Sequence, residues 1–528
     1  MPGPVSDATL NLALQAREKF AASDFLKEAL KPLERDKGSN EWAVSGAHTD
    51  SGYPLIANDP HLSMDTPAIW YESNLVYEMG PASYSVSGVS FAGAPSIILG
   101  CNNWICWGAT VHPMDVTDIF QDQAVLLPLP GGGLPVATVH NGVAEPVRTI
   151  FQSYFANSIG DGELDSVSRA DLSLLEGGIT LVVPRRNNGP ILAVDGSSVL
   201  TLQYTGLAAT QETRYFHEIN RARNMEDFRE ALQYFDFGSQ NWIYADVEGN
   251  IAYFTSAENP IRSDLAAGTV DGGIPPWFIR DGTGALNHEW APVSNPQPGQ
   301  AIPFEIMPAD EMPHVINPDS GYIANANNDP IGVTLDNNPL NQLRPADPPG
   351  SNGIYYLNNG YADYRQGRVD RVLQALTAAD AAPVTLQDMM DLQGNDEILD
   401  PELILPTLLG IVQGVDVPPS SAMAQAIDVL STWDYSTPTG IAEGWDAGDS
   451  PVTMNAPGID EIRNSVAATV YATWRSMLIQ NTIDATLSAI GLGNNLPGST
   501  IAERAFSYHL MNYGTNGGVG ASGINFFS

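Results

Sequence analysis

A run near the N-terminus, GSNEWAVSG at residues 38–46, constrains the fold more than any other stretch of the chain. Its apolar alternation is typical of a strand, and a turn at residues 51–52 followed by Leu55–Asn58 predicts a second strand beside it. Cleavage of the Gly38–Ser39 bond would leave Ser39 at the start of a buried strand with a hydroxyl and a free α-amine. An α-amine, with a pKa of about 7.7–8.0, can serve as the base that a serine nucleophile needs. The alternative for this dipeptide alone is an ordinary turn.

Residues 39–62, SNEWAVSGAHTDSGYPLIANDPHL, resemble the penicillin acylase family, which includes penicillin amidases, acyl-homoserine lactone acylases and cephalosporin acylases. These proteins are N-terminal nucleophile hydrolases, so the resemblance implies an α+β fold, a four-layer αββα sandwich with helical insertions. It also implies an autoprocessed amide hydrolase that removes the acyl side chain from small N-acyl substrates, either acyl-homoserine lactones or β-lactam antibiotics such as penicillin. The resemblance recurs in order in four further blocks, at residues 106–120, 241–253, 321–330 and 364–371.

The resemblance implies a catalytic set built around Ser39. Cleavage of the Gly38–Ser39 bond would release the nucleophile, by attack of the Ser39 hydroxyl on the Gly38 carbonyl. An amide hydrolase must also stabilise a tetrahedral oxyanion with donors that already point at it. The matching donors are the backbone N–H of Val111 and the side chain of Asn327, for which Asn325 or Asn328 would be the alternative in a shifted alignment.

His61 and Arg365 complete the implied catalytic set. A histidine at position 61 is more typical of acyl-homoserine lactone and cephalosporin acylases than of penicillin G acylases, and it could orient the Ser39 amine and hydroxyl. The positive charge of Arg365 would disfavour protonation of the Ser39 amine. A structural histidine and a surface arginine at the start of a helix are the respective alternatives.

An acidic loop after the second block of resemblance matches the calcium-binding loop of the family. Asp115, Thr117 and Asp118 would supply hard oxygen ligands, with further ligands from Pro260 and Asp336. The resemblance therefore implies one structural Ca²⁺ and no organic cofactor. A solvated acidic turn is the alternative.

The charge balance excludes one class of partner. The chain carries 23 basic and 61 acidic residues, a net charge of −38, so it would repel a phosphate backbone, and we expect no nucleic-acid partner. It contains no run of about 18 apolar residues, which predicts no membrane span. Residues 1–14 lack the pattern of a signal peptide. The resemblance nevertheless implies a periplasmic or secreted protein.

The cysteines are Cys101 and Cys106. A separation of five places them on opposite faces of a single strand, which predicts two buried thiols and no disulfide. Five aromatic residues are candidates for an apolar acyl pocket by their place relative to the blocks of resemblance, namely Trp70, Phe91, Trp107, Phe120 and Trp242.

The order of predicted elements favours a layered α+β chain, with strands up to about residue 255 and helices after Arg365. Asn224 is a candidate N-cap of a helix at 225–235. By resemblance, residues 1–38 are a residual α-chain and spacer segment, so an α chain of the same precursor, mostly missing here, would be a partner. Residues 39–528 are the catalytic domain, expected to be truncated at its C-terminus, with a mostly helical insertion at about 366–511. Helices are predicted at residues 7–34, 368–378, 386–392, 422–432, 461–487 and 501–511.

Two other functions fit parts of the sequence. An incomplete or unprocessed fragment of such an acylase would bind acyl ligands without turnover, because an intact Gly38–Ser39 bond leaves no free amine. An acidic carbohydrate-binding β protein would account for the aromatic residues but not for the ordered blocks.

Overall fold

The structure is a computed structural model of the chain. It describes residues 7–22, 38–62, 66–78, 80, 83–129, 132–153, 155–157, 160, 162–163, 167–169, 178–274, 276–330, 364–412, 417–418, 420–438, 458–493, 496–520 and 523–527. Asp336 and the predicted helical residues 23–34 lie outside these ranges.

A three-stranded antiparallel sheet contains the GSNEWAV segment of residues 38–44. Its order is β2 (Leu55–His61), β1 (Gly38–Val44) and β20 (Tyr322–Asn325), so β1 is the central strand. The predicted pairing of the first two strands is confirmed.

A seven-stranded antiparallel sheet packs on one face of this small sheet. Its order is β19 (His314–Ile316), β17 (Ile251–Ser256), β16 (Gln240–Asp246), β6 (Ile105–Val111), β5 (Leu99–Asn102), β4 (Tyr84–Phe91) and β3 (Trp70–Tyr77).

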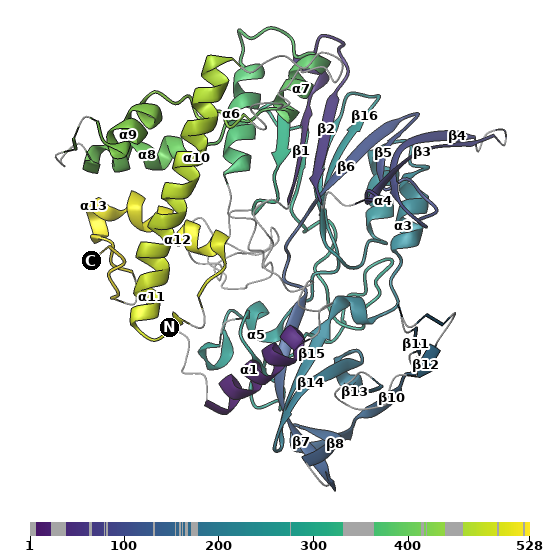
Figure 1. Cartoon of the computed structure of the whole chain (residues 1–528). Coiled ribbons are helices and arrows are strands. Elements are labelled where there is room, and N and C mark those ends of the chain that lie inside the picture. The colour runs from purple at the N-terminus through teal and green to yellow at the C-terminus, as the bar shows by residue number, and fades with distance from the viewer. Residues whose placement is uncertain are drawn as a thin grey trace.

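The alternation of side chains along β1 explains how the layers stack. Trp42 and Val44 pack against α6 (Arg365–Leu376) and α7 (Leu386–Gln393), whereas Ala43 packs against the seven-stranded sheet. The far face of the large sheet is covered by two more helices, α3 (Glu212–Ile219) and α4 (Met225–Leu232). The predicted four-layer αββα sandwich is therefore confirmed (Figure 1).

A third sheet, of eight strands, lies below the sandwich in Figure 1 and packs against α1 (Asp7–Ala22). Its main path is β10 (Arg148–Phe151), β13 (Ile179–Val183), β14 (Gly189–Asp195), β15 (Ser198–Tyr204), β7 (Thr117–Leu129), β8 (Gly132–His140) and β9 (Val143–Pro146), and β18 (Arg280–Asp281) pairs with β7. A small pair joins β11 (Phe155–Asn157) to β12 (Val167–Arg169). The short helix α5 (Ser263–Ala266) precedes β18.

The later helices gather beside the sandwich, in green to yellow in Figure 1. They are α8 (Asp400–Val412), α9 (Ala422–Ser431), α10 (Ile459–Ile479), a π-helical turn (Gln480–Asp484), α11 (Ala485–Ala489), α12 (Ser499–Met511) and α13 (Tyr513–Asn516). The helices predicted from residue 368 onward are present, and Asn224 caps α4 by accepting a hydrogen bond from the Asp227 N–H at 2.9 Å. Within the described ranges, none of the helices has both the length and the apolar character needed to cross a bilayer.

The prediction that the two cysteines remain unpaired is wrong. Cys101 and Cys106 form a disulfide, with a Cα–Cα distance of 4.0 Å. They lie on different strands, β5 and β6, and face each other directly in the antiparallel register. Asn102 closes the turn between these strands by accepting hydrogen bonds from the backbone N–H groups of Trp104 and Ile105. A hairpin thus replaces the single strand on which the prediction depended.

Packing between β1 and α6 should contribute strongly to stability. Leu373 is 0% exposed and lies in the cluster with Trp42 and Val44. Replacing Leu373 with Ala should lower the free energy of unfolding by about 2–5 kcal/mol, because it leaves a cavity. Leu386→Ala, at a position that is 64% exposed on α7, should change it by less than about 0.5 kcal/mol. Denaturant unfolding of both variants tests this, and equal losses would contradict the packing described.

Candidate active site

Ser39 lies near the beginning of β1 and is 3% exposed. Its hydroxyl donates a hydrogen bond to the carbonyl oxygen of Gly38 at 2.5 Å. Its backbone N–H donates to Asn327 Oδ1 at 2.6 Å. The hydroxyl therefore lies at the carbonyl group that would be attacked in chain cleavage, and the nitrogen of the same peptide bond is held by a side chain.

Arg365, the first residue of α6, connects β1 to the turn after β20. Its Nη1 donates to the Ser39 carbonyl at 2.6 Å and to Asn40 Oδ1 at 2.7 Å. Its Nη2 donates to the Ala326 carbonyl at 3.0 Å and to Asn327 Oδ1 at 3.1 Å. The planar guanidinium suits this arrangement because its donors have a fixed geometry.

Asn327 is fully buried and has a φ of +64°, a left-handed conformation that asparagine adopts more readily than most residues. Its Oδ1 faces two donors, Ser39 N and Arg365, whereas its Nδ2 donates to the Val111 carbonyl at 2.8 Å. These partners fix the orientation of the amide group. Three predicted residues, Ser39, Asn327 and Arg365, are thus in direct contact, and Val111 joins them through its carbonyl.

Gly38 is the close-packed residue of the site. A Cβ atom at this position would lie 2.6 Å from Arg365 Nη2 and 3.1 Å from Asn327 Oδ1. Only glycine lets the chain approach these two side chains so closely.

His61 lies at the end of β2, opposite Gly38 in the strand register. Its Nε2 is 3.3 Å from Asp59 Oδ2, and both side chains are partly exposed. Among the described residues, the His61 ring has Asp59 as its polar partner. The ring makes no hydrogen bond to Ser39 in this part of the structure.

Polar side chains occupy the space between the two sheets next to Ser39. Glu41 points the same way as Ser39 and pairs in register with Asn58 and Asn325. Burial raises the pKa of Glu41 well above its usual value, while a backbone hydrogen bond with Ile243 acts in the opposite direction. Burial likewise lowers the pKa of His112 to about 3, although a hydrogen bond with Asn241 acts in the opposite direction. Glu41 and His112 therefore both lie where burial disfavours the charged form of the side chain.

The acidic loop predicted to bind calcium packs against a buried arginine, Arg262. Arg262 Nε donates to Asp118 Oδ2 at 2.7 Å, and Arg262 Nη2 lies 3.2 Å from Asp115 Oδ1. Trp290 Nε1 donates to the same Asp118 oxygen, at 2.5 Å. Asp118 Oδ1 is buried and has no hydrogen-bond partner in the described part of the chain. Two carboxylates thus face one guanidinium, and Asp118 Oδ1 is an oxygen available to a hard cation. Within the described ranges, no group of three or more His, Cys, Asp or Glu side chains is arranged to hold a metal ion.

Two more of the predicted calcium ligands, Thr117 and Pro260, lie in the described part of the chain. Thr117 begins β7, and its N–H donates to Asp115 Oδ1 at 3.3 Å. Pro260, two residues before Arg262, forms an isolated bridge with Ile306.

The aromatic residues proposed for an acyl pocket lie elsewhere. Trp70, Trp107 and Trp242 belong to or pack against the core beneath α3 and α4, on the face of the large sheet away from Ser39. Phe91 stacks on Trp70 with ring centroids 4.5 Å apart, and Phe120 lies under Arg186 in the eight-stranded sheet. Alternation along the strands of the large sheet directs Trp70, Trp107 and Trp242 to the face opposite Ser39, whereas Phe120 belongs to another sheet.

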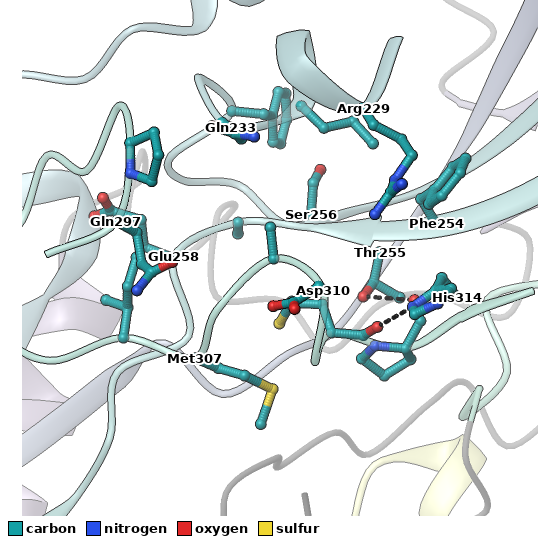
Figure 2. A pocket seen from close by; sticks show the side chains of 18 of the residues that line it. Arg229, Gln233, Phe254, Thr255, Ser256, Glu258, Gln297, Met307, Asp310 and His314 are labelled. Atoms are coloured by element: carbon teal, nitrogen blue, oxygen red, sulfur yellow. Dashed lines mark hydrogen bonds between the residues drawn. The ribbon is translucent and has the colours of Figure 1, made fainter. Parts of the chain in front are cut away.

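A cavity of about 300 Å³ lies on that opposite face, between α4, the end of β17 and the loops at 297–300 and 306–314. Figure 2 shows Glu258 and Gln297 at one end and Arg229, Phe254 and His314 at the other. None of the predicted catalytic residues lines it. Burial raises the pKa of Glu258 to about 7, and the nearby carboxylates of Asp236 and Glu212 add to the shift.

Several residues of the site were not found from the sequence. Asn40 directly follows Ser39, and Asn241 begins one of the blocks of resemblance, so position in a block was the available signal. Asn58 donates to the carbonyls of Asn40 and Ala109, both at 3.0 Å, and thereby joins the two sheets. Arg262 is far from Asp115 in the chain, and only the fold brings them together.

The four layers, with a serine near the start of the central buried strand, define an N-terminal nucleophile hydrolase fold. The chain belongs to the penicillin amidase family, whose model matches residues 6–514.

Individual relatives agree with this assignment. Penicillin G acylase of Escherichia coli is 26% identical over 410 residues, 75% of this chain and 39% of that protein. The acyl-homoserine lactone acylase QuiP of Pseudomonas aeruginosa is 38% identical over 85 residues, 16% of this chain and 10% of that protein. The structure of a thermostable penicillin G acylase from Alcaligenes faecalis matches with a TM-score of 0.60 at 18% identity, over 93% of this chain and 74% of that one. The chain thus spans well under half the length of these two curated relatives.

The buried carboxyls near the cavity predict a pH-dependent stability. The pKa of Asp236, like that of Glu258, is raised to about 7, mainly by burial. The folded protein therefore binds more protons than the unfolded chain between about pH 4 and 7, where unfolded carboxyls have already ionised. This stabilisation is complete below about pH 4 and is lost as the pH rises through 7.

Thermal unfolding between pH 5 and 8 measures this effect. The fall in stability across that range should be smaller in Glu258→Gln than in the parent protein, because one of the titrating groups is gone. Glu226→Gln, at a carboxylate that also lines the cavity but is exposed, is the matched control and should retain the full fall. Identical pH profiles for the parent and Glu258→Gln would contradict the assignment.

Proposed function

We propose that the chain is an amide hydrolase for N-acyl substrates, in which Ser39 becomes the nucleophile after the Gly38–Ser39 bond is cleaved. One observation supports this proposal most strongly. The Ser39 hydroxyl is hydrogen-bonded to the Gly38 carbonyl oxygen, while Asn327 accepts from the Ser39 backbone N–H and Arg365 donates to the Ser39 carbonyl oxygen. Membership of the penicillin amidase family supports the same class of reaction.

The first stage would be cleavage of the chain. Ser39 Oγ adds to the Gly38 carbonyl carbon, the carbon–nitrogen bond breaks, and the acyl group moves from nitrogen to oxygen as an ester. Water then hydrolyses the ester, leaving a carboxylate on Gly38 and a free amine on Ser39.

The second stage would be substrate turnover. The Ser39 amine accepts the hydroxyl proton while Oγ attacks the substrate amide carbon. The Val111 N–H and the second N–H of Asn327 Nδ2 stabilise the oxyanion. The leaving amine takes the proton, and water releases the acid from the acyl-enzyme. Arg365 lies close enough to disfavour a protonated Ser39 amine.

The proposed substrates are amides with an apolar acyl group. Relatives named as a penicillin G acylase and as acyl-homoserine lactone acylases support two subclasses, β-lactam antibiotics and acyl-homoserine lactones. We also propose a structural Ca²⁺ held by Asp115, Thr117 and Asp118, where it would neutralise the remaining negative charge of the loop.

Intact mass and N-terminal sequencing of the purified protein test the proposed chemistry. We expect a chain that begins at Ser39 and an uncleaved chain in Ser39→Ala, because the alanine lacks the attacking oxygen. The processed protein should then hydrolyse members of a panel of N-acyl p-nitroanilides from acetyl to dodecanoyl. An uncleaved, inactive parent protein would refute the proposal and leave a protein that binds acyl ligands without turnover.

Thermal unfolding with and without added Ca²⁺ tests the proposed metal site. A hundredfold excess over the dissociation constant should stabilise the parent protein by about 2.7 kcal/mol. Asp118→Asn should lose this calcium-dependent increment, whereas Asp195→Asn, at an exposed position on β14, should keep it. The absence of any increment in the parent protein would eliminate the site.

A further inference from the structure

Asn241 lies at the point where the two sheets of the sandwich meet the candidate site. It belongs to β16 and pairs in register with Thr110 of β6. Its neighbours on the same face, Ile243 and Ala245, pack against β1 and β20 across the space between the sheets. Asn241 is 0% exposed and is a polar residue on this otherwise apolar face of β16.

The Asn241 amide makes hydrogen bonds on both sides of that space. Its Nδ2 donates to Thr110 Oγ1 at 2.8 Å, to Asn325 Oδ1 at 3.1 Å and to the Val111 carbonyl at 3.2 Å. Its Oδ1 accepts from the Tyr253 hydroxyl at 2.5 Å. Val111 belongs to the large sheet and Asn325 to the small one, so a single side chain joins the two.

Both of these contacts lead to the proposed oxyanion donors. The Val111 carbonyl that Asn241 contacts also accepts a hydrogen bond from Asn327 Nδ2. Asn325 Oδ1, which Asn241 also contacts, accepts the backbone N–H of Asn327 at 2.8 Å. Asn241 is therefore hydrogen-bonded directly to Val111 and is linked to Asn327 through Asn325.

We infer that Asn241 is a positioning residue that fixes the distance between the two proposed oxyanion donors, the Val111 N–H and the Asn327 side chain. The inference rests on the proposed function. The two donors are carried by different sheets. Without such a link, the distance between them would change whenever one sheet shifted relative to the other. A displacement of about 1 Å in a catalytic group can cost about a hundredfold in rate. Tyr253 orients the amide by donating to its oxygen, so that its N–H groups face Thr110 and Val111.

The test compares Asn241→Ala and Tyr253→Phe with Asn220→Ala. Asn220 is also a buried asparagine with two backbone hydrogen bonds, to the N–H and carbonyl of Ile97, but it lies beside α3, away from Ser39. Each variant is measured for processing, melting temperature, kcat and KM on the best p-nitroanilide. Inhibition is measured with two probes, an alkylboronic acid and a carboxylic acid, whose alkyl chains match the acyl group of that p-nitroanilide. In the boronic adduct, Ser39 Oγ bonds to boron and its proton passes to the Ser39 amine, which places a tetrahedral anion in the hole.

Loss of a positioning residue should affect the tetrahedral species alone. Asn241→Ala should lower kcat by about 10–100-fold with KM changed by less than about threefold, and should weaken boronic acid binding by a similar factor. Binding of the carboxylic acid should be unchanged. Tyr253→Phe, which conserves volume, should show the same selective loss at about 3–10-fold. Asn220→Ala should lower the melting temperature but leave kcat and both inhibition constants within about threefold.

The inference would be overturned if neither Asn241→Ala nor Tyr253→Phe weakened the boronic acid more than Asn220→Ala does. If Asn241→Ala does not fold, Tyr253→Phe decides between the outcomes. A parent protein that stays uncleaved and inactive refutes the proposed function instead, and it is recognised before any variant is compared.

Discussion

β1 is buried on both faces, and the candidate site takes its geometry from that burial. Trp42 and Val44 face the helices, and Ala43 faces the large sheet. A slip of one residue in register would turn Trp42 toward the other sheet and Ser39 toward the helices. The register that buries the core therefore also sets the direction of the Ser39 hydroxyl. Stability and the placement of Ser39 are two consequences of one packing arrangement.

The space between the sheets is polar at the end near Ser39 and apolar further along. Asn58, Asn241 and Asn325 meet there, and each has partners on the opposite sheet. Buried amides are costly unless they are hydrogen-bonded, so this network favours one alignment of the sheets over neighbouring ones. Apolar side chains such as Ile243 and Ile323 supply burial without directional preference. The amides add the directional contacts that the proposed oxyanion hole, with one donor from each sheet, would require.

Local patterns were sufficient to predict much of the fold but not the contacts between distant segments. Periodicity predicted the strands of residues 38–58 and the later helices, and the capping role of Asn224 followed from its residue type. The cysteine prediction failed because spacing alone does not reveal a hairpin turn. The contact of Arg262 with Asp115 and the bridging role of Asn241 depend on tertiary packing. The family resemblance identified Ser39, Asn327 and Arg365 as a set, and the fold brings these three residues into contact.

In the proposed reaction, the same three residues would serve both cleavage of the chain and turnover of substrate. Before cleavage, Asn327 Oδ1 accepts the hydrogen of the Ser39 amide, and Arg365 donates to the same oxygen. After cleavage, Ser39 N becomes an amine that can still donate one hydrogen to Asn327 Oδ1. Its lone pair is then free for the hydroxyl proton, and the guanidinium nearby opposes a second positive charge. Asn327 follows β20 and Arg365 begins α6, so departure of the leading segment would remove neither of the elements that carry these side chains.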